Sequence, residues 1–304
     1  MTDSHQPSKL TALTIRRLTL TRGSLTSILQ CCPALETIDL WETTLIPSWN
    51  FDDYQHARVN RLTALITDTF DDGNPPLLVH FPELTWLDTY YDSSLSAFPT
   101  QKVKDTVSRW CPNLNYLGTN HTPALILSHL VANVLFGLSG LVFNYDNISP
   151  EVILALLCYP DNWITLSVYS LRDYYSHSVD DPVPMVKDHF QGSRWMIQSI
   201  MRGYSKLRLF HFPDHEMDMD QIDRVSWSCN ELKSIRVRIK GLDTKERIEG
   251  AINRWKEGKK QKSLGKEIKN PEEEDDSIEA RVARHLLQFD KLRILWLGTK
   301  TCAL

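Results

Sequence analysis

The residues best suited to chemistry are crowded into one short stretch, HFPDHEMDMD at positions 211–220. Its two histidines and four acidic residues are types that ligate metal ions. His211 and His215 are spaced as on a metal-binding helix, but Pro213 between them would break that helix. The stretch also does not match H-E-x-x-H. We therefore predict a solvated loop that follows a strand, with a weak surface zinc site as the alternative.

Recognisable catalytic motifs do not occur elsewhere in the sequence. There is no glycine-rich phosphate loop with Walker spacing and no G-x-S-x-G nucleophile elbow. The six cysteines include no C-x-x-C pair, and no apolar run reaches the length of a membrane span. The N-terminus lacks the apolar core of a signal peptide. We predict a protein that is not an enzyme, holds no metal or cofactor and does not bind membranes. We expect it in the cytoplasm or nucleus, with its cysteines reduced.

Composition is ordinary for a soluble protein with a large core. The chain has 304 residues, of which 42% are hydrophobic and 24% charged. The formal net charge of −4 argues against a globally basic nucleic-acid binder.

The elements that must position any site follow from a repeat of a helix and a short strand. In the stretch 25–45, Leu25 and Leu29 lie on one helical face, and Pro33 stops the helix. The segment Leu35–Leu40 then carries apolar residues in slots one, four and six of a strand. Neither half can bury its apolar face alone, so copies must stack. A similar helix is expected after Ser149, with that serine as N-cap and Pro150 in the first turn.

Ten copies of the strand pattern are expected. Their first slots are 20, 27, 22, 30, 24 and 25 residues apart up to Trp163, within or near the period of leucine-rich repeats. This phase predicts nine or ten parallel strands in one curved sheet, with helices outside. The copies are Ile15–Leu20, Leu35–Leu40, Leu62–Thr67, Leu84–Thr89, Leu114–Thr119, Leu138–Phe143, Trp163–Val168, Leu207–Phe212, Leu232–Val237 and Leu292–Leu297.

Three phrases carry a family resemblance: ILQCCPALETIDL, WCPNLNYLGT and HLLQFDKLRILWLG. They resemble the leucine-rich repeats of ribonuclease-inhibitor-like proteins, most of all those of fungal F-box/leucine-rich-repeat proteins. The resemblance implies an α/β horseshoe solenoid over 1–304, with a parallel concave sheet and outer helices. It further implies the substrate-binding arm of an F-box-type ubiquitin ligase receptor, which would reach a cullin-type complex through a missing or separate segment, because no F-box-like segment precedes the first repeat.

Two segments interrupt the repeat. We expect residues 170–192 to form a polar loop on the rim and residues 241–281 to form a charged, mobile insertion. The second contains seven Lys or Arg and two Glu between Arg254 and Lys269, then five acids from Glu272 to Asp276. Its apolar residues look too few to dock firmly. The alternative is a nuclear-import signal around Lys259–Lys262 or a basic patch for nucleic acid.

The proposed binding surface comprises slots three, five and seven, which point away from the core because side chains alternate along a strand. Large aromatic and charged residues fill these slots, as at protein interfaces. We predict that a protein partner docks there. Alternatively, loops cover the rings, or the chain is a stand-alone scaffold, an inhibitor or an enzyme with a site on the concave rim. The predicted binding residues are Asp39, Trp41, Trp86, Asp88, Tyr90, Tyr116, Tyr169, Arg236, Arg238 and Trp296.

Overall fold

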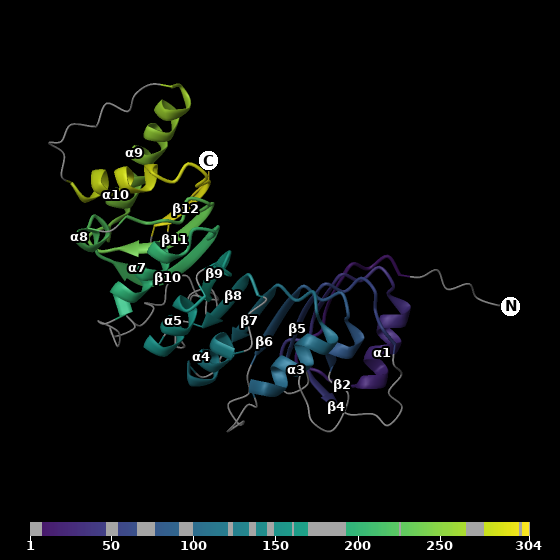
Figure 1. Cartoon of the computed structure of the whole chain (residues 1–304). Coiled ribbons are helices and arrows are strands. Elements are labelled where there is room, and N and C mark those ends of the chain that lie inside the picture. Colours follow the sequence, from purple (N-terminus) through teal and green to yellow (C-terminus); the bar gives the residue numbers. More distant parts are fainter. Residues whose placement is uncertain are drawn as a thin grey trace. The chain divides into compact units, whose positions relative to one another are not determined.

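The computed structural model divides the chain into two compact units, unit 1 (Met1–Asn147) and unit 2 (Ile148–Leu304), which are described separately (Figure 1). The predicted rim loop at 170–192 and the acidic run Glu272–Asp276 lie outside the residues that the structure describes. Those residues are 8–46, 54–65, 77–90, 100–120, 124–133, 138–144, 149–159, 161–169, 193–224, 226–265, 277–297 and 300–303.

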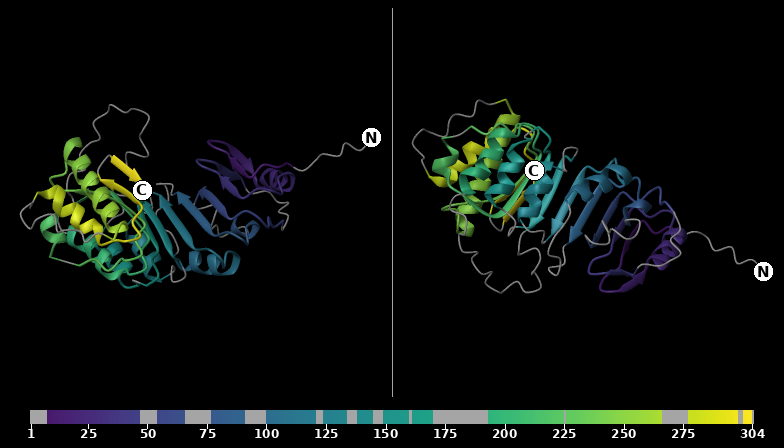
Figure 2. Two further views of the ribbon diagram at one scale, coloured as in Figure 1. Left: turned by 90° about the horizontal axis from the view of Figure 1, so that it is seen from above. Right: turned by 60° about the horizontal axis from the view of Figure 1, so that its bottom comes forward.

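Unit 1 is built on a parallel sheet whose helices follow one face (Figures 1 and 2). Its described strands, in spatial order, are β1 (Ala12–Thr14), β3 (Thr37–Asp39), β5 (Arg61–Leu65), β6 (Trp86–Tyr90), β7 (Tyr116–Asn120) and β8 (Gly140–Asn144). A second parallel pair joins β2 (Thr19–Thr21) to β4 (Thr44–Ile46). The helical elements are α1 (Arg22–Cys31), the 3-10 helix η1 (Leu77–His80), α3 (Thr100–Trp110) and α4 (Ala124–Asn133).

Unit 2 repeats this architecture and ends its sheet differently. Parallel pairing joins β9 (Thr165–Tyr169), β10 (Leu209–Met217), β11 (Ser234–Ile239) and β12 (Ile294–Leu297). The strand β13 (Lys300–Ala303) then pairs with β12 in the antiparallel direction. The helices are α5 (Pro150–Leu157), α7 (Ser193–Gly203), α8 (Met219–Ile222), α9 (Lys245–Ser263) and α10 (Ile278–Leu287). No helix in the described part of the chain is long and apolar enough to cross a membrane.

Most of the predicted pattern residues are buried in the core of their unit, but Leu18 of the predicted first copy is 55% exposed. In unit 1 the fourth-slot residues lie in register on adjacent strands and are at most 3% exposed: Ile38, Leu62, Leu87, Leu117 and Leu141. In unit 2 the equivalent residues are fully buried: Leu166, Phe210, Ile235 and Leu295. Parallel strands with helices between them are therefore present in both units, although the described part of unit 1 has no helix between β3 and β5.

Two predicted copies are out of phase with the sheet. Leu13 pairs with Ile38, so the first copy is Leu10–Ile15 rather than Ile15–Leu20. Leu62 also pairs with Ile38, so the third copy is Val59–Ala64 rather than Leu62–Thr67. With first slots at positions 10, 35, 59 and 84, the spacings become 25, 24 and 25 residues, which is more regular than predicted.

The expectation that the charged insertion is too polar to dock does not hold for residues 245–263. They form α9, which starts at the N-cap Thr244 and buries one apolar stripe that includes Ile248, Ile252 and Trp255. These residues follow the i, i+4, i+7 spacing of a helix face. Gly258 lets α9 approach α10 closely, because a Cβ there would lie 2.5 Å from Leu287 Cδ1.

Two lysines of the stretch Lys259–Lys262, the alternative import signal, lie against the end of α10. Lys259 Nζ donates hydrogen bonds to the carbonyl oxygens of Phe289 and Asp290, at 2.6 and 2.9 Å. Lys262 forms an ion pair with the Asp290 carboxylate. Burial lowers the pKa of Lys259, although the Asp290 charge opposes this. These lysines therefore attach α9 to the turn that follows α10.

Candidate functional site

The predicted binding residues lie on the sheet face opposite the core, here called the open face. In unit 1, Asp39, Trp41, Trp86 and Tyr116 are half-buried, whereas Asp88 is only 8% exposed. In unit 2, Arg236 and Trp296 are half-buried and Arg238 is exposed. Tyr90 and Tyr169 belong to β6 and β9, and their side chains lie outside the described part.

A column of stacked side chains crosses the open face of unit 1. Arg61, Trp86 and Tyr116 are in register on β5, β6 and β7. The Trp86 and Tyr116 rings are stacked, with centroids 3.3 Å apart and planes inclined by 19°. Arg61 Cζ lies 4.4 Å from the Trp86 ring centroid, within the range of a cation–π contact. Trp86 therefore lies between a cation and a second ring.

Asp88, two residues after Trp86 on β6, lies beside this column and bonds to two of its members. Trp86 Nε1 donates a 2.6 Å hydrogen bond to Asp88 Oδ2, and Arg61 donates a longer one of 3.4 Å to the same oxygen. A buried carboxylate needs such partners, because burying a charge without them is costly. Burial, and secondarily the charge of Asp88, raises the pKa of Tyr116, while Arg61 opposes this. The Tyr116 hydroxyl therefore stays protonated at neutral pH.

Two glycines make room for the column. A Cβ on Gly118 would lie 1.8 Å from Asp88 Oδ1. A Cβ on Gly140 would lie 2.2 Å from Tyr116 Cδ2. Any larger residue at either position would collide with the side chain on the preceding strand. The column thus depends on glycine at one slot of β7 and one slot of β8.

The N-terminal edge of the same face is tied by ion pairs between successive repeats. Arg16 contacts Asp39 at 3.0 Å, and Arg17 contacts Glu42 at 2.6 Å. Arg17 and Glu42 both adopt positive φ, 57° and 54°, which is unusual for residues other than glycine. Exposed pairs of this kind contribute little stability. Both pairs join the segment after β1 to the end of β3 and the turn that follows it.

The open face of unit 2 carries a smaller arrangement of the same kind. His211, Arg236 and Trp296 are in register on β10, β11 and β12. Arg236 Cζ lies 4.8 Å from the Trp296 ring centroid. The His211 imidazole hydrogen bonds to Ser234 Oγ at 2.8 Å. Unit 2 therefore also combines arginine with an aromatic ring, but the stacked residues span two strands, whereas those in unit 1 span three.

The sequence predicted a loop for the acidic and histidine-rich stretch 211–220, but most of this stretch belongs to a strand. Strand β10 runs to Met217, with a register shift against β11 between Phe212 and Glu216. Asp218 then caps α8 by accepting a hydrogen bond from the Asp220 N–H at 3.0 Å. Among the described residues, no group of three or more His, Cys, Asp or Glu is arranged to hold a metal ion.

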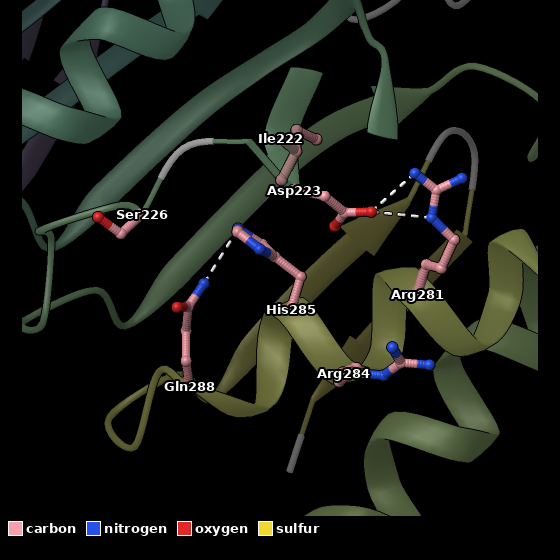
Figure 3. Close-up of a pocket in the computed structure, with 7 residues that line it drawn as sticks. All are labelled: Ile222, Asp223, Ser226, Arg281, Arg284, His285 and Gln288. Carbon is pink, nitrogen blue, oxygen red and sulfur yellow. Dashed lines mark hydrogen bonds and ion pairs between the residues drawn. The ribbon is translucent and has the colours of Figure 1, made fainter. Parts of the chain in front are cut away.

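Unit 2 also has a polar pocket that the sequence analysis did not anticipate (Figure 3). Its volume is about 350 Å³, at the lower end of the range for small-molecule sites. Four lining residues follow one face of α10 at i, i+3, i+4 and i+7 spacing. The lining residues are Ile222, Asp223, Ser226, Arg281, Arg284, His285 and Gln288.

The groups in this pocket largely satisfy one another. Arg281 bonds both Asp223, at 2.8 Å, and Asp220, at 2.7 Å, which lowers the pKa of Asp220. Burial lowers the pKa of His285 to about 4, so its imidazole is neutral at physiological pH. The Gln288 amide lies 3.0 Å from that ring (Figure 3). We interpret the pocket as polar contacts that tie α10 to α8.

Comparison of the sequence with protein-family models and with curated proteins finds no match. The functional interpretation therefore depends on the geometry of the open faces and on the resemblance of the repeat phrases. Those phrases coincide with structure: the strand halves of the three are β3, β7 and β12. Their cysteines Cys32 and Cys111 are buried at the junction of helix and strand.

The sequence analysis missed Arg61, which stands at one end of the column. With the third copy at Val59–Ala64, Arg61 falls in slot three, the slot that Trp86 and Tyr116 occupy in the next copies. The signal was the more regular spacing of 24 and 25 residues that this phase gives. The same correction places Arg16 in slot seven of the first copy.

Proposed function

We propose that this chain is a protein–protein recognition module of the leucine-rich-repeat type, whose partner docks on the open sheet faces. The observation that carries the proposal is the Arg61–Trp86–Tyr116 column. The core is complete without it, because slots one, four and six supply the buried residues. Preordered aromatic and arginine side chains are the residues that contribute most to binding at protein interfaces.

A narrower proposal follows from the resemblance to fungal F-box/leucine-rich-repeat proteins. In that proposal the chain is the substrate-binding arm of a ubiquitin ligase receptor, acts in the cytoplasm or nucleus, and reaches a cullin-type complex through another segment. The support is the resemblance of the helix-end Cys-Pro phrases. A stand-alone scaffold or inhibitor would use the same faces without a cullin.

Affinity capture followed by mass spectrometry tests both levels of the proposal. The bait is the whole chain, compared with Trp86→Ala on the open face and with Leu154→Ser, which changes an exposed residue of α5. We expect a partner that Leu154→Ser retains and Trp86→Ala loses. Cullin subunits among the captured proteins would favour the ligase receptor, and their absence would favour a scaffold. Equal capture by every open-face variant would contradict the proposed function.

A further inference from the structure

The column on unit 1 ends in the Tyr116 ring on β7 and in the Arg61 guanidinium on β5. Tyr116 lies against Gly140, and Trp86 is covered by Tyr116 on one side and Arg61 on the other. Beyond Arg61, the next in-register residues are Thr37 on β3 and Ala12 on β1. Both side chains are short. The guanidinium of Arg61 therefore has no in-register ring on its outer side.

The contacts of Arg61 fix its position but leave part of its guanidinium exposed. Its side chain is 48% exposed, and its interactions with described residues are the Trp86 ring and the 3.4 Å bond to Asp88. A guanidinium has several N–H donors and two faces that can stack on planar groups. One face and most donors thus remain accessible to a partner.

We infer that an aromatic side chain of the protein partner stacks on the outer face of Arg61, above Thr37, and extends the column by one layer. This inference rests on the proposed function and names the chemistry that the partner must present. Adjacent strands are about 4.8 Å apart, and atoms in contact are roughly 3.5–4 Å apart. One ring therefore fits in one strand spacing. The ring quadrupole is attracted to the cation that Asp88 and Trp86 hold in place.

The charges around this position favour a protein side chain over a nucleobase. Asp88 lies beside the column, and Asp39 is the open-face carboxylate of the adjacent strand β3. Each already takes one arginine as its partner, Arg61 and Arg16. A nucleic acid would bring phosphates close to these two carboxylates, and phosphate contacts need surplus basic residues. An uncharged aromatic side chain has no such cost.

Nuclear magnetic resonance titration of the full chain with two blocked tripeptides tests the inference. The probes are acetyl-Gly-Trp-Gly-amide and acetyl-Gly-Leu-Gly-amide. We expect the tryptophan probe to shift the Arg61 Nε–H signal saturably, and the leucine probe to bind at least threefold more weakly. Equal binding of the two probes, or tighter binding of oligothymidylate than of the tryptophan probe, would overturn the inference.

Variants at Thr37 and Arg61 locate the probe. Thr37→Phe places a ring of the chain itself where the ring of the probe is expected, next to Arg61, and should abolish probe binding. The matched Thr37→Val should leave probe binding unchanged. Arg61→Gln removes the cation and should weaken binding at least threefold. If Thr37→Phe does not fold, the Arg61→Gln result decides. Unchanged probe binding in either folded variant would overturn the inference.

Capture of a partner separates this inference from the proposed function. If Trp86→Ala or Arg236→Ala abolishes capture but Thr37→Phe does not, the open faces bind protein and the added aromatic layer is wrong. If no open-face variant changes capture, the proposed function fails as well. Loss of capture in Thr37→Phe but not in Thr37→Val would support both.

Discussion

The open faces of the two units carry the same kind of arginine–tryptophan contact, but only in unit 1 does a second aromatic ring extend it. Each unit sets an arginine over a tryptophan on the neighbouring strand, at 4.4 Å in unit 1 and 4.8 Å in unit 2. In unit 1 a third strand adds Tyr116, and glycines on β7 and β8 give the column room. In unit 2 the residue paired with Trp296 on the far side is Thr301 of the antiparallel β13. Parallel register makes cation–π pairs easy to form, and the neighbouring small residues decide whether they extend.

The largest expected effect tests whether the two units share an equivalent core. Leu87→Ala in unit 1 and Leu295→Ala in unit 2 each remove a fully buried fourth-slot side chain. Each should lower the free energy of unfolding by about 2–5 kcal/mol through the lost burial and the cavity. Urea denaturation of both variants measures this. A loss below about 1 kcal/mol in one variant only would show that the two cores are not equivalent.

Acid should destabilise unit 2 through His285. The folded-state pKa of about 4 lies below the ordinary value of 6.5 because the imidazole is buried. The unfolded chain therefore takes up a proton first as pH falls, and stability is lost between about pH 6.5 and pH 4, by up to about 3 kcal/mol. Thermal unfolding at about pH 7.5 and pH 5 should show a smaller acid loss in His285→Gln than in the unmodified chain. An identical loss would contradict this assignment.

A methyl group at Gly118 should break the feature that distinguishes unit 1. Gly118→Ala would place Cβ against Asp88 Oδ1, displacing the carboxylate that anchors Trp86. We expect a loss of about 1–3 kcal/mol of stability from overpacking and a change in the near-ultraviolet circular dichroism of the column.

The matched control for this change is Gly250→Ala in α9, where the nearest atom to an added Cβ is Glu279 Cγ at 3.6 Å. Alanine inside a helix is favoured over glycine, so this variant should gain up to about 1 kcal/mol. Destabilisation by Gly250→Ala that equals the effect of Gly118→Ala would mean that the column is not the cause.

The smallest effect on stability, but the largest on binding, is expected for Trp86→Ala. It removes the middle layer of the column and one hydrogen bond to Asp88, which should cost about 1–2 kcal/mol of stability. Partner binding should weaken about tenfold or more. Trp86→Phe keeps a ring but loses the indole N–H, so it should retain most binding. If Trp86→Ala unfolds the chain while its folded fraction binds normally, the ring belongs to the core.

Much of the fold is readable from the sequence because a strand and a helix impose different apolar periods. The predicted cap at Ser149 is confirmed: its Oγ accepts from the Val152 N–H at 3.3 Å, with Pro150 in the first turn. The third copy was misplaced because Leu62 and Leu65 also stand three apart. Its true sixth slot holds Ala64, whose small side chain is a weak apolar signal.

The docking of α9, the pocket and the role of Arg61 were not predicted from the sequence. Charged residues interrupt the apolar pattern of α9, and the residues around the pocket are far apart in the sequence. In α9 the apolar stripe is interleaved with lysine and glutamate, so composition indicated a solvated segment. Beside the pocket, α8 is joined to α10 through Asp220 and Arg281, which are 61 residues apart. Arg61 was missed for a different reason, since its role depends on which slot it occupies. Residues that adjoin on neighbouring strands can be predicted from the sequence only when every copy of the repeat is assigned its correct first residue.

The contact between α9 and α10 has a consequence for lysine modification. Lys256 and Lys260 are exposed, so an acetyltransferase can reach them while the helix stays docked. Lys259 is different, because its ammonium group donates to two carbonyl oxygens at the end of α10. Acetylation there would remove the charge and most of the donors. The Asp290 carbonyl oxygen would lose its bond to Lys259, whereas the Phe289 carbonyl oxygen would keep the bond from the Leu292 N–H at 3.2 Å. Helix α9 therefore carries two kinds of lysine: the exposed Lys256 and Lys260, and the pair Lys259 and Lys262, whose acetylation would remove contacts between α9 and the end of α10.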